Sequence, residues 1–216
     1  MEIKRNITTQ NFNNSSISRI KYIVVHYTGN NGDTAYGNTK YSKKYRGASA
    51  HYFVDENSIY QSIEDKNVAW HCGANSYKHP YCRNSNSLGV ELCSRKDNKG
   101  NYYFMDKTVD NAVELVKMLM TKYNVPIANV IRHYDVTGKN CPAPFVRNNK
   151  AWQEFKSRLV AKGEQIMKQN VKINGKVKSL DTINKDGYTY IKVRDLSDVF
   201  NIGYNKETKL ITLSVK

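Results

Sequence analysis

Two short apolar runs that each end in a histidine limit the folds open to this chain. Tyr22 to His26 is rich in β-branched residues and is typical of a buried strand. A second apolar run extends from Ile127 to His133. Because strand and helix patterns are mixed along the chain, the expected fold class is α/β, a sheet with covering helices. Both histidines should then lie at the rim of the sheet, where the sites of such proteins are usually built.

Three further strands and one long helix are predicted from hydrophobic periodicity. The strands are Ala50 to Val54, Ser58 to Ile63 and Leu88 to Cys93. Between Asp106 and Lys122, apolar residues recur at helical spacing. This pattern predicts an amphipathic helix of several turns that ends before Asn124-Val125-Pro126.

A last helix is predicted to begin at Lys150, to pack on the first domain and to run on to Gln169 as a polar tether. Three large apolar residues lie at i, i+3 and i+7 in this segment: Trp152, Phe155 and Leu159. The chain is therefore predicted to have two domains, residues 1–168 and a small C-terminal α+β module, residues 169–216.

The C-terminal module is predicted to be rich in strands. Val171 and Ile173 alternate with polar residues into an Asn174-Gly175 hairpin turn. Strands are also predicted at Tyr188 to Val193 and Lys209 to Val215, around a short helix from Val193 to Phe200. A segment of this length is marginal for an independent core, so contact with the first domain or with a second copy is expected.

The chain is strongly basic, with 34 Lys and Arg against 19 Asp and Glu and a formal net charge of +15. Such a surface attracts polyanions, and nucleic acid, acidic membranes and anionic cell-wall polymers all qualify; the alternative is a basic surface kept for solubility. The charge is dispersed, which argues against nucleic acid. No run is long enough to span a bilayer, and no apolar signal segment follows Met1, so synthesis in the cytoplasm without a signal peptide is expected.

The segment "RHYDVTGKNCP", Arg132 to Pro142, contains two groups that zinc favours as ligands, the imidazole of His133 and the thiolate of Cys141. Their spacing is too wide for one helical face, and the residues between them are a turn signal, so loop geometry should hold any shared metal. With His26 they would give three ligands and an open fourth position, as in catalytic zinc sites. The alternative is two polar strand ends and a small buried cysteine.

Two charged residues complete the predicted chemistry. Glu91 shares one strand face with Gly89 and Cys93, and beside a metal it would act as general acid and base; an ion pair with a lysine is an equal alternative. Lys139 would stabilise a developing oxyanion, although a lone lysine is more often solvated. The remaining cysteines have no CxxC spacing; a Cys72–Cys82 disulfide is conceivable, but free thiols are expected.

Five motifs in order make the chain resemble the zinc-dependent N-acetylmuramoyl-L-alanine amidases of the Amidase_2 family, which are related to the peptidoglycan recognition proteins. They are "IVVHYT" (Ile23 to Thr28), "SAHYFVDENSIYQ" (Ser49 to Gln61), "AWHCG" (Ala69 to Gly73), "NSLGVEL" (Asn86 to Leu92) and "RHYDVTGKNCP". The resemblance implies a mixed central sheet flanked by helices and one Zn²⁺ held by His26, His133 and Cys141. It also implies cleavage of the amide between N-acetylmuramic acid and L-alanine in peptidoglycan.

The resemblance further implies Glu91 as general acid and base and Lys139 as the oxyanion partner. His51 stands where some relatives have a tyrosine near the zinc. Five residues are expected to contact substrate: His51, Trp70, His71, Asn86 and Thr137. The implied setting is the bacterial cell wall, as a phage or prophage endolysin of a Gram-positive host. The alternatives are an autolysin or a non-catalytic muropeptide-binding protein, and such binders typically lack the cysteine that is present here as Cys141.

"YIKVRDLSDVFNIGYN", Tyr190 to Asn205, loosely resembles a small stalk domain named after the amino-terminal regions of copper amine oxidases. No histidine follows His133, so the sequence gives no support for copper binding. The resemblance implies a cell-wall-binding module, and the alternative is a dimerisation or spacer unit.

Overall fold

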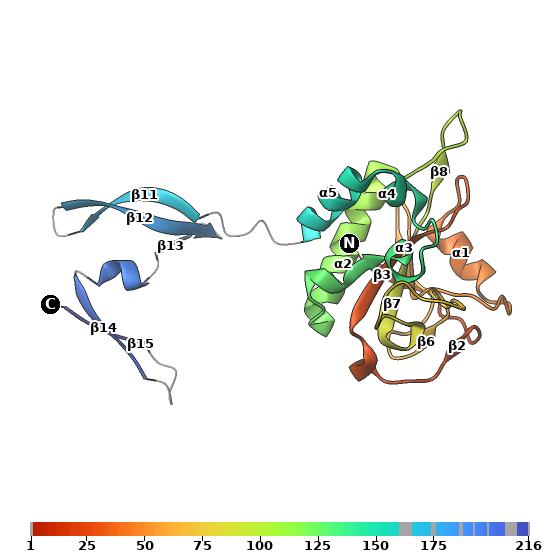
Figure 1. Cartoon of the computed structure of the whole chain (residues 1–216), viewed down its shortest axis with the longest axis horizontal. Coiled ribbons are helices and arrows are strands. Elements are labelled where there is room, and N and C mark those ends of the chain that lie inside the picture. Colours follow the sequence, from red (N-terminus) through yellow and green to blue (C-terminus); the bar gives the residue numbers. More distant parts are fainter. Residues whose placement is uncertain are drawn as a thin grey trace. The chain divides into compact units, whose positions relative to one another are not determined.

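The computed structural model describes residues 2–159, 166–173, 176–185, 188–191, 193–197, 199–205 and 211–215. The chain divides into two compact units, Met1–Val160 and Ala161–Lys216 (Figure 1). The division comes earlier in the sequence than the boundary predicted at residue 168. The reason is that Ile166 already begins a strand of the second unit.

A six-stranded mixed sheet forms the centre of the first unit. Only β4 and β5 pair in antiparallel fashion, and every other neighbouring pair is parallel. The strand order is β1 (Ile3–Arg5), β5 (Ile59–Gln61), β4 (Tyr52–Val54), β7 (Ser87–Leu92), β3 (Tyr22–Tyr27) and β10 (Val130–Arg132). The predicted mixed sheet is therefore confirmed, and the histidine run beginning at Tyr22 lies next to its centre.

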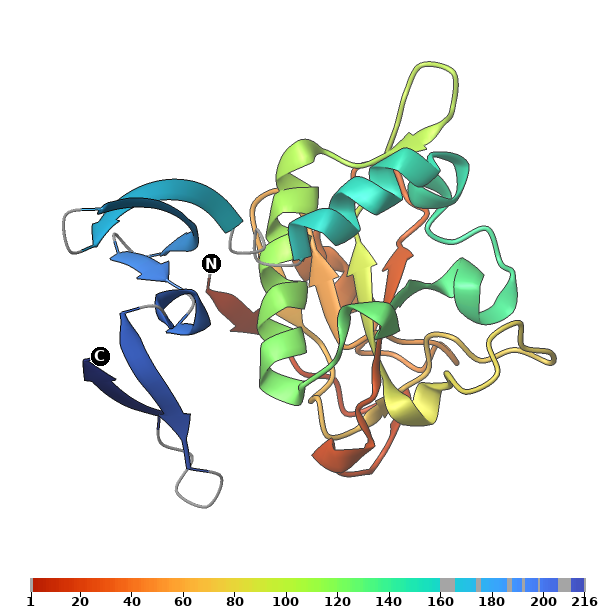
Figure 2. The ribbon, with the colours of Figure 1, turned by 60° about the vertical axis from the view of Figure 1, so that its left-hand side comes forward.

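One face of this sheet is covered by two helices, α2 (Asp106–Tyr123) and α5 (Asn149–Leu159) (Figure 2). Alternate residues of the strands, such as Ile23 and Val25, point into the core that these helices close. The core also includes an aromatic group in which Trp152 stacks on Phe155 with ring centroids 5.4 Å apart. Fully burying one such side chain stabilises the fold by roughly 1.5–3 kcal/mol.

The opposite face of the sheet carries the intervening residues, including His26, Gly89 and Glu91. Helix α1 (Ala35–Tyr41), which was not predicted, covers part of this face over Phe53. Short elements frame the rest of the unit: β2 (Phe12–Asn13), η1 (Ile17–Arg19), β6 (Val68–Ala69), η2 (Asn84–Asn86), β8 (Arg95–Lys96), β9 (Tyr102–Tyr103), η3 (Ile127–Asn129), α3 (His133–Thr137) and α4 (Ala143–Arg147).

The second unit contains two small antiparallel sheets. One is formed by β11 (Ile166–Ile173), β12 (Lys176–Lys185) and β13 (Tyr188–Ile191), and the other by β14 (Phe200–Tyr204) and β15 (Ile211–Val215). The predicted turn at Asn174-Gly175 lies outside the described residues. The predicted helix from Val193 is only the short η4 (Val193–Leu196).

The prediction that the last helix continues to Gln169 is wrong. Helix α5 ends at Leu159, and Ile166–Gln169 pair with β12 as part of β11. Apolar and polar residues alternate along β11, which is the period of a strand. The helical spacing of the apolar residues in α5 does not continue into this segment. Within the described ranges, no helix is long and apolar enough to cross a membrane.

Candidate metal centre

His26 and Glu91 lie side by side because their strands pair in parallel register. His26 on β3 is the direct partner of Glu91 on β7. Paired residues of neighbouring strands project from the same face, and this is the face that α2 and α5 leave uncovered. The two side chains approach to 3.9 Å, measured from His26 Nδ1 to Glu91 Oε1.

His133 lies at the point where β10 gives way to α3. It was predicted as the end of a strand, but it is the first residue of the short helix. Asp135 fixes this start, because its carboxylate accepts hydrogen bonds from the backbone N–H and the guanidinium of Arg132 at 2.8–3.0 Å. Since β10 pairs in parallel with β3, His133 is brought to the same rim as His26.

Cys141 is returned to this rim by the loop that follows α3. The helix ends at Thr137, and Gly138 follows with a φ of 85°, in the left-handed region that glycine adopts without strain. The loop is closed by a hydrogen bond from the Tyr134 N–H to the Cys141 carbonyl oxygen at 2.7 Å. The prediction that loop geometry would set the position of Cys141 agrees with this arrangement.

The ligand atoms of His26, His133 and Cys141 all lie within 4.8 Å of one another. Cys141 Sγ is 3.7 Å from His26 Nδ1, and the two imidazole ring centroids are 4.6 Å apart. All three side chains are buried. Two ring nitrogens and one sulfur in this arrangement form a site of the metal-binding type, with a donor set that suits zinc.

Burial governs the protonation of the triad. It lowers the pKa of His26 well below its usual value and that of His133 to about 4, and the charge of Lys139 acts in the same direction on both. Burial also raises the pKa of Cys141 to about 12. The imidazoles are therefore neutral, as coordination requires, whereas the thiol must lose its proton when a metal binds.

Glu91 is a half-buried carboxylate that lacks a full set of partners. Its Oε2 atom has no hydrogen-bond partner among the described residues. Burial raises the pKa of Glu91 to about 8, with the Lys139 ammonium opposing that rise. A carboxyl group with a pKa near neutrality can both accept and donate a proton, which is the requirement for general acid–base chemistry.

Lys139 is exposed and lies in the loop between α3 and Cys141. Its charge lowers the pKa of Glu91, His26 and His133, so its ammonium acts on the whole cluster. Its backbone N–H bonds the hydroxyl of Thr137 at 3.3 Å, and that hydroxyl donates to the His133 carbonyl oxygen. Its role as oxyanion partner stays a prediction.

The other predicted substrate residues have different surroundings. Trp70 is half-buried, donates from Nε1 to Asn13 at 2.6 Å and packs edge-on against Tyr45. Asn86 is held at η2, where its side chain bonds the backbone of Arg83 and Tyr81. Their contacts with substrate stay predictions.

His51 is fully buried and belongs to a structural network. Its Nδ1 accepts a hydrogen bond from the Gly89 N–H, and its Nε2 lies 3.0 Å from the Asn67 carbonyl oxygen. These contacts join β7 to the segment before β6. Within the described part of the chain, His51 has no hydrogen bond to the triad. Its predicted substrate contact also stays a prediction.

His71 has a contact that the sequence did not reveal. Its predicted place in the substrate groove stays a prediction. The side chain is buried, and its Nδ1 lies 3.0 Å from His26 Nε2. The two residues are far apart in the chain and on different elements, so no spacing pattern could have indicated this pairing.

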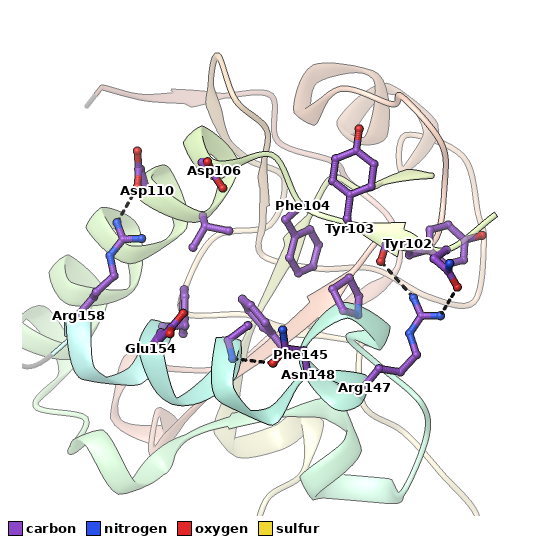
Figure 3. Close-up of a pocket in the computed structure, with 15 residues that line it drawn as sticks. Tyr102, Tyr103, Phe104, Asp106, Asp110, Phe145, Arg147, Asn148, Glu154 and Arg158 are labelled. Atoms are coloured by element: carbon purple, nitrogen blue, oxygen red, sulfur yellow. Dashed lines mark hydrogen bonds and ion pairs between the residues drawn. The ribbon is translucent and has the colours of Figure 1, made fainter. Parts of the chain in front are cut away.

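A separate cavity of about 720 Å³ lies between β9, α2, α4 and α5 (Figure 3). Phe104 and Phe145 give it an apolar wall, and Arg158 pairs with Asp110 at its edge. The triad residues and Glu91 do not line it. This cavity is therefore distinct from the candidate metal centre.

The mixed sheet, the buried triad and the neighbouring carboxylate are the features of a metallohydrolase. Residues 16–144 match a family model, Amidase_2, that is described as N-acetylmuramoyl-L-alanine amidase. This match covers more than half of the sequence, and the chain belongs to the N-acetylmuramoyl-L-alanine amidase family.

A probable N-acetylmuramoyl-L-alanine amidase of Bacillus licheniformis is 36% identical to this chain over an alignment of 155 residues, and the match covers 66% of this chain and 42% of that protein. The chain spans about half the length of the curated relatives it matches. Among solved structures, PlyL is similar with a TM-score of 0.63 and 29% identity, over 74% of this chain and 98% of that chain. A mutant endolysin from Bacillus subtilis gives a TM-score of 0.60 and 30% identity, with 74% and 99% covered.

Proposed function

We propose that this chain is a zinc-dependent hydrolase that cleaves the amide between N-acetylmuramic acid and the L-alanine of the stem peptide in peptidoglycan. The observation that carries the proposal is the buried triad of His26, His133 and Cys141 beside Glu91, in a chain of this family. A purely structural cluster would not require a carboxylate oxygen buried without a partner at the same place.

Zinc fits the donor set. Two neutral imidazoles and one thiolate leave a fourth position open, the arrangement that distinguishes catalytic from structural sites. When bound there, zinc would supply Lewis acidity that makes water more acidic and polarises the scissile carbonyl.

Glu91 and Lys139 would carry the proton transfers and the charge stabilisation. Glu91, with its raised pKa, would accept a proton from the attacking water and return it to the departing L-alanine nitrogen. Lys139 would stabilise the negative charge that develops on the carbonyl oxygen. Five further residues are proposed as substrate contacts: His51, Trp70, His71, Asn86 and Thr137.

An endolysin of a phage or prophage of a Gram-positive host is the setting that the similarity to a Bacillus subtilis endolysin favours. An autolysin is the alternative. The net charge of +15 would support binding to anionic wall polymers. The second unit would bind cell wall, or join two copies of the chain.

The test uses the purified full chain, zinc and peptidoglycan. New L-alanine amino termini should appear without new reducing sugar ends, and a Cys141→Ala chain should lose zinc and this activity together. Unchanged release by Cys141→Ala would contradict the zinc mechanism. Binding of muropeptides without release would indicate instead a recognition protein.

A further inference from the structure

The two ring nitrogens of His26 have different surroundings. Nδ1 faces the triad, 3.7 Å from Cys141 Sγ and 3.9 Å from Glu91 Oε1. Nε2 faces away from it and lies 3.0 Å from Nδ1 of His71. A neutral imidazole carries its proton on only one of the two nitrogens, so His26 can bind a metal through Nδ1 only when the proton is on Nε2.

A series of hydrogen bonds leads from His26 to a backbone carbonyl group. Nε2 of His71 lies 3.1 Å from the Ser87 hydroxyl, and that hydroxyl lies 2.6 Å from the carbonyl oxygen of Arg83. The Cys72 thiol makes a weak contact with this hydroxyl at 3.9 Å, and the Cys82 thiol is a further polar neighbour.

The carbonyl end fixes the direction of every bond in the series. A carbonyl oxygen can only accept, so the Ser87 O–H must donate to Arg83. The Ser87 oxygen is then free to accept from His71, so when the His71 ring carries a single proton, that proton is on Nε2. Nδ1 of His71 is left as an acceptor, and it must receive the Nε2–H of His26.

We infer that His71 is a positioning residue that holds His26 in the tautomer able to bind zinc through Nδ1. The inference rests on the metal site of the proposed function and adds to it a cause for the orientation of one ligand. Metal-binding histidines are commonly fixed in this way by a partner on the second ring nitrogen, and loss of that partner typically weakens metal binding about 10- to 100-fold. Here the partner is itself oriented by Ser87.

The packing around His71 holds its ring in place. A Cβ atom on Gly89 would lie 2.6 Å from Cγ of His71, so only glycine at this point of β7 lets the ring lie so close to the strand. The backbone N–H groups of His71 and Cys72 both donate to Asn84 Oδ1, at 3.1 and 2.7 Å. Because Asn84 follows Arg83 directly, His71 and the carbonyl group that ends the series are held by the same short segment.

The experiment uses the full chain stripped of metal by a chelator. The tautomer of His26 is read from ¹⁵N–¹H long-range NMR spectra at mildly alkaline pH, and the zinc Kd from competition with a chromogenic chelator. The native chain should show His26 with its proton on Nε2. His71→Ala should raise the zinc Kd about 10- to 100-fold and mix the two tautomers.

His71→Asn is the rescue variant, because the amide oxygen of asparagine can accept where Nδ1 did. It should restore most of the zinc affinity and the single tautomer. Ser87→Ala should give an intermediate Kd, since His71 is then free to turn its own proton towards His26. His79→Ala is the matched control, because His79 bonds the backbone of Tyr81 and Cys82 and does not contact the triad.

Three results would overturn the inference: a native His26 with its proton on Nδ1, a His71→Ala chain with native zinc affinity, or equal losses in His71→Ala and His71→Asn. The spectrum of the native chain decides the matter even if a variant does not fold. The readouts are independent of catalysis, so a chain that shows this tautomer and affinity pattern but releases no L-alanine termini would contradict the proposed function alone.

Discussion

Glu91 occupies a position that is costly for a charged side chain. Its Oε2 atom is buried without a hydrogen-bond partner in the described structure, and leaving a buried carboxylate unpaired destabilises the folded state. Its sequence pattern was equally consistent with a lysine ion pair, but the basic group that lies near it, at 3.9 Å, is the Nδ1 atom of His26, and burial keeps that imidazole neutral. This environment raises the pKa of Glu91 to about 8. The raised pKa favours proton transfer, whereas the environment that causes it costs stability.

Replacement of this carboxyl by an amide tests that function. Glu91→Gln is expected to lower turnover about 10²- to 10⁴-fold, because an amide cannot accept or return a proton. The zinc content should stay native, because Glu91 is not a member of the triad. Turnover is measured by release of amino termini and zinc by metal analysis, with Glu154→Gln on the exposed surface of α5 as the matched control. Full turnover in Glu91→Gln would remove the acid–base assignment.

His51 links pH to stability through its burial. Burial lowers its pKa well below the usual value, the charge of Arg19 acts in the same direction, and the Asn67 hydrogen bond opposes the shift. The folded state therefore keeps His51 neutral, whereas the unfolded chain protonates it below about pH 6.5. The stability that the fold gains from neutral His51 is fully present above that pH and is lost as the pH falls towards the pKa of His51 in the folded state.

His51→Gln is expected to flatten the fall in unfolding free energy on the acid side of about pH 6.5, by up to ~1.4 kcal/mol per pH unit. Urea unfolding of the native and variant chains, both with metal removed, measures the two slopes. At alkaline pH the unfolding free energies of the two proteins should differ by a constant amount, which reflects the packing of the side chain. Identical slopes would show that His51 is not held neutral by the fold.

At the scale of elements, the sequence predicted the strands that carry the site. The β-branched run ending at His26 and the alternation around Glu91 are local patterns, and both became central strands, β3 and β7. Helix α2 was predicted to within one residue, since its apolar stripe matches the helical period throughout.

The remaining elements depend on contacts that no local pattern encodes. Helix α1 has a weak apolar stripe and packs through only a few small residues, so periodicity did not reveal it. The bond between His26 and His71 joins distant segments, and its geometry depends on Gly89 at the crossing. Sequence periodicity indicates which face of a helix or strand is buried. It does not indicate which side chain of a distant segment contacts that face.

The turn after α3 is an element whose conformation should control the metal site. Gly138 has φ of 85°, and nothing lies within 4 Å of a Cβ built there, so an alanine would cost backbone strain without a clash. Gly138→Ala is expected to lower the unfolding free energy by about 1–2 kcal/mol and to weaken zinc binding, because the turn sets the position of Cys141.

Gly100→Ala provides the matched control for that variant. Gly100 has φ of 81° and equally open surroundings, in the β8–β9 connection. It should show a similar loss of stability in urea unfolding but a native zinc Kd. Equal zinc affinities for the two variants would mean that the conformation of the α3 turn does not determine the position of the thiolate.

At the scale of the whole molecule, the two compact units have separate tasks in the proposed function. Every described residue of the main hydrophobic core belongs to the first unit, including Trp152, Phe155 and Leu159 of α5. The catalytic groups also lie there. The second unit contains two small sheets and carries part of the positive charge of the chain. This charge favours a role for the second unit in binding an anionic wall polymer, and not in catalysis.

A chain cut after residue 160 is therefore expected to keep its thermal unfolding transition and its activity on soluble muropeptides. A chain cut after residue 148 should not fold, because it loses α5 and with it three buried apolar side chains. Sedimentation with whole cell walls then measures the contribution of the second unit. The 160-residue chain should bind less than the full chain, and its remaining binding should weaken as salt rises because positive charge contributes to it. Equal sedimentation of the two chains would assign wall binding to the first unit. Loss of the unfolding transition on cutting after residue 160 would instead show that the first unit needs the second in order to fold.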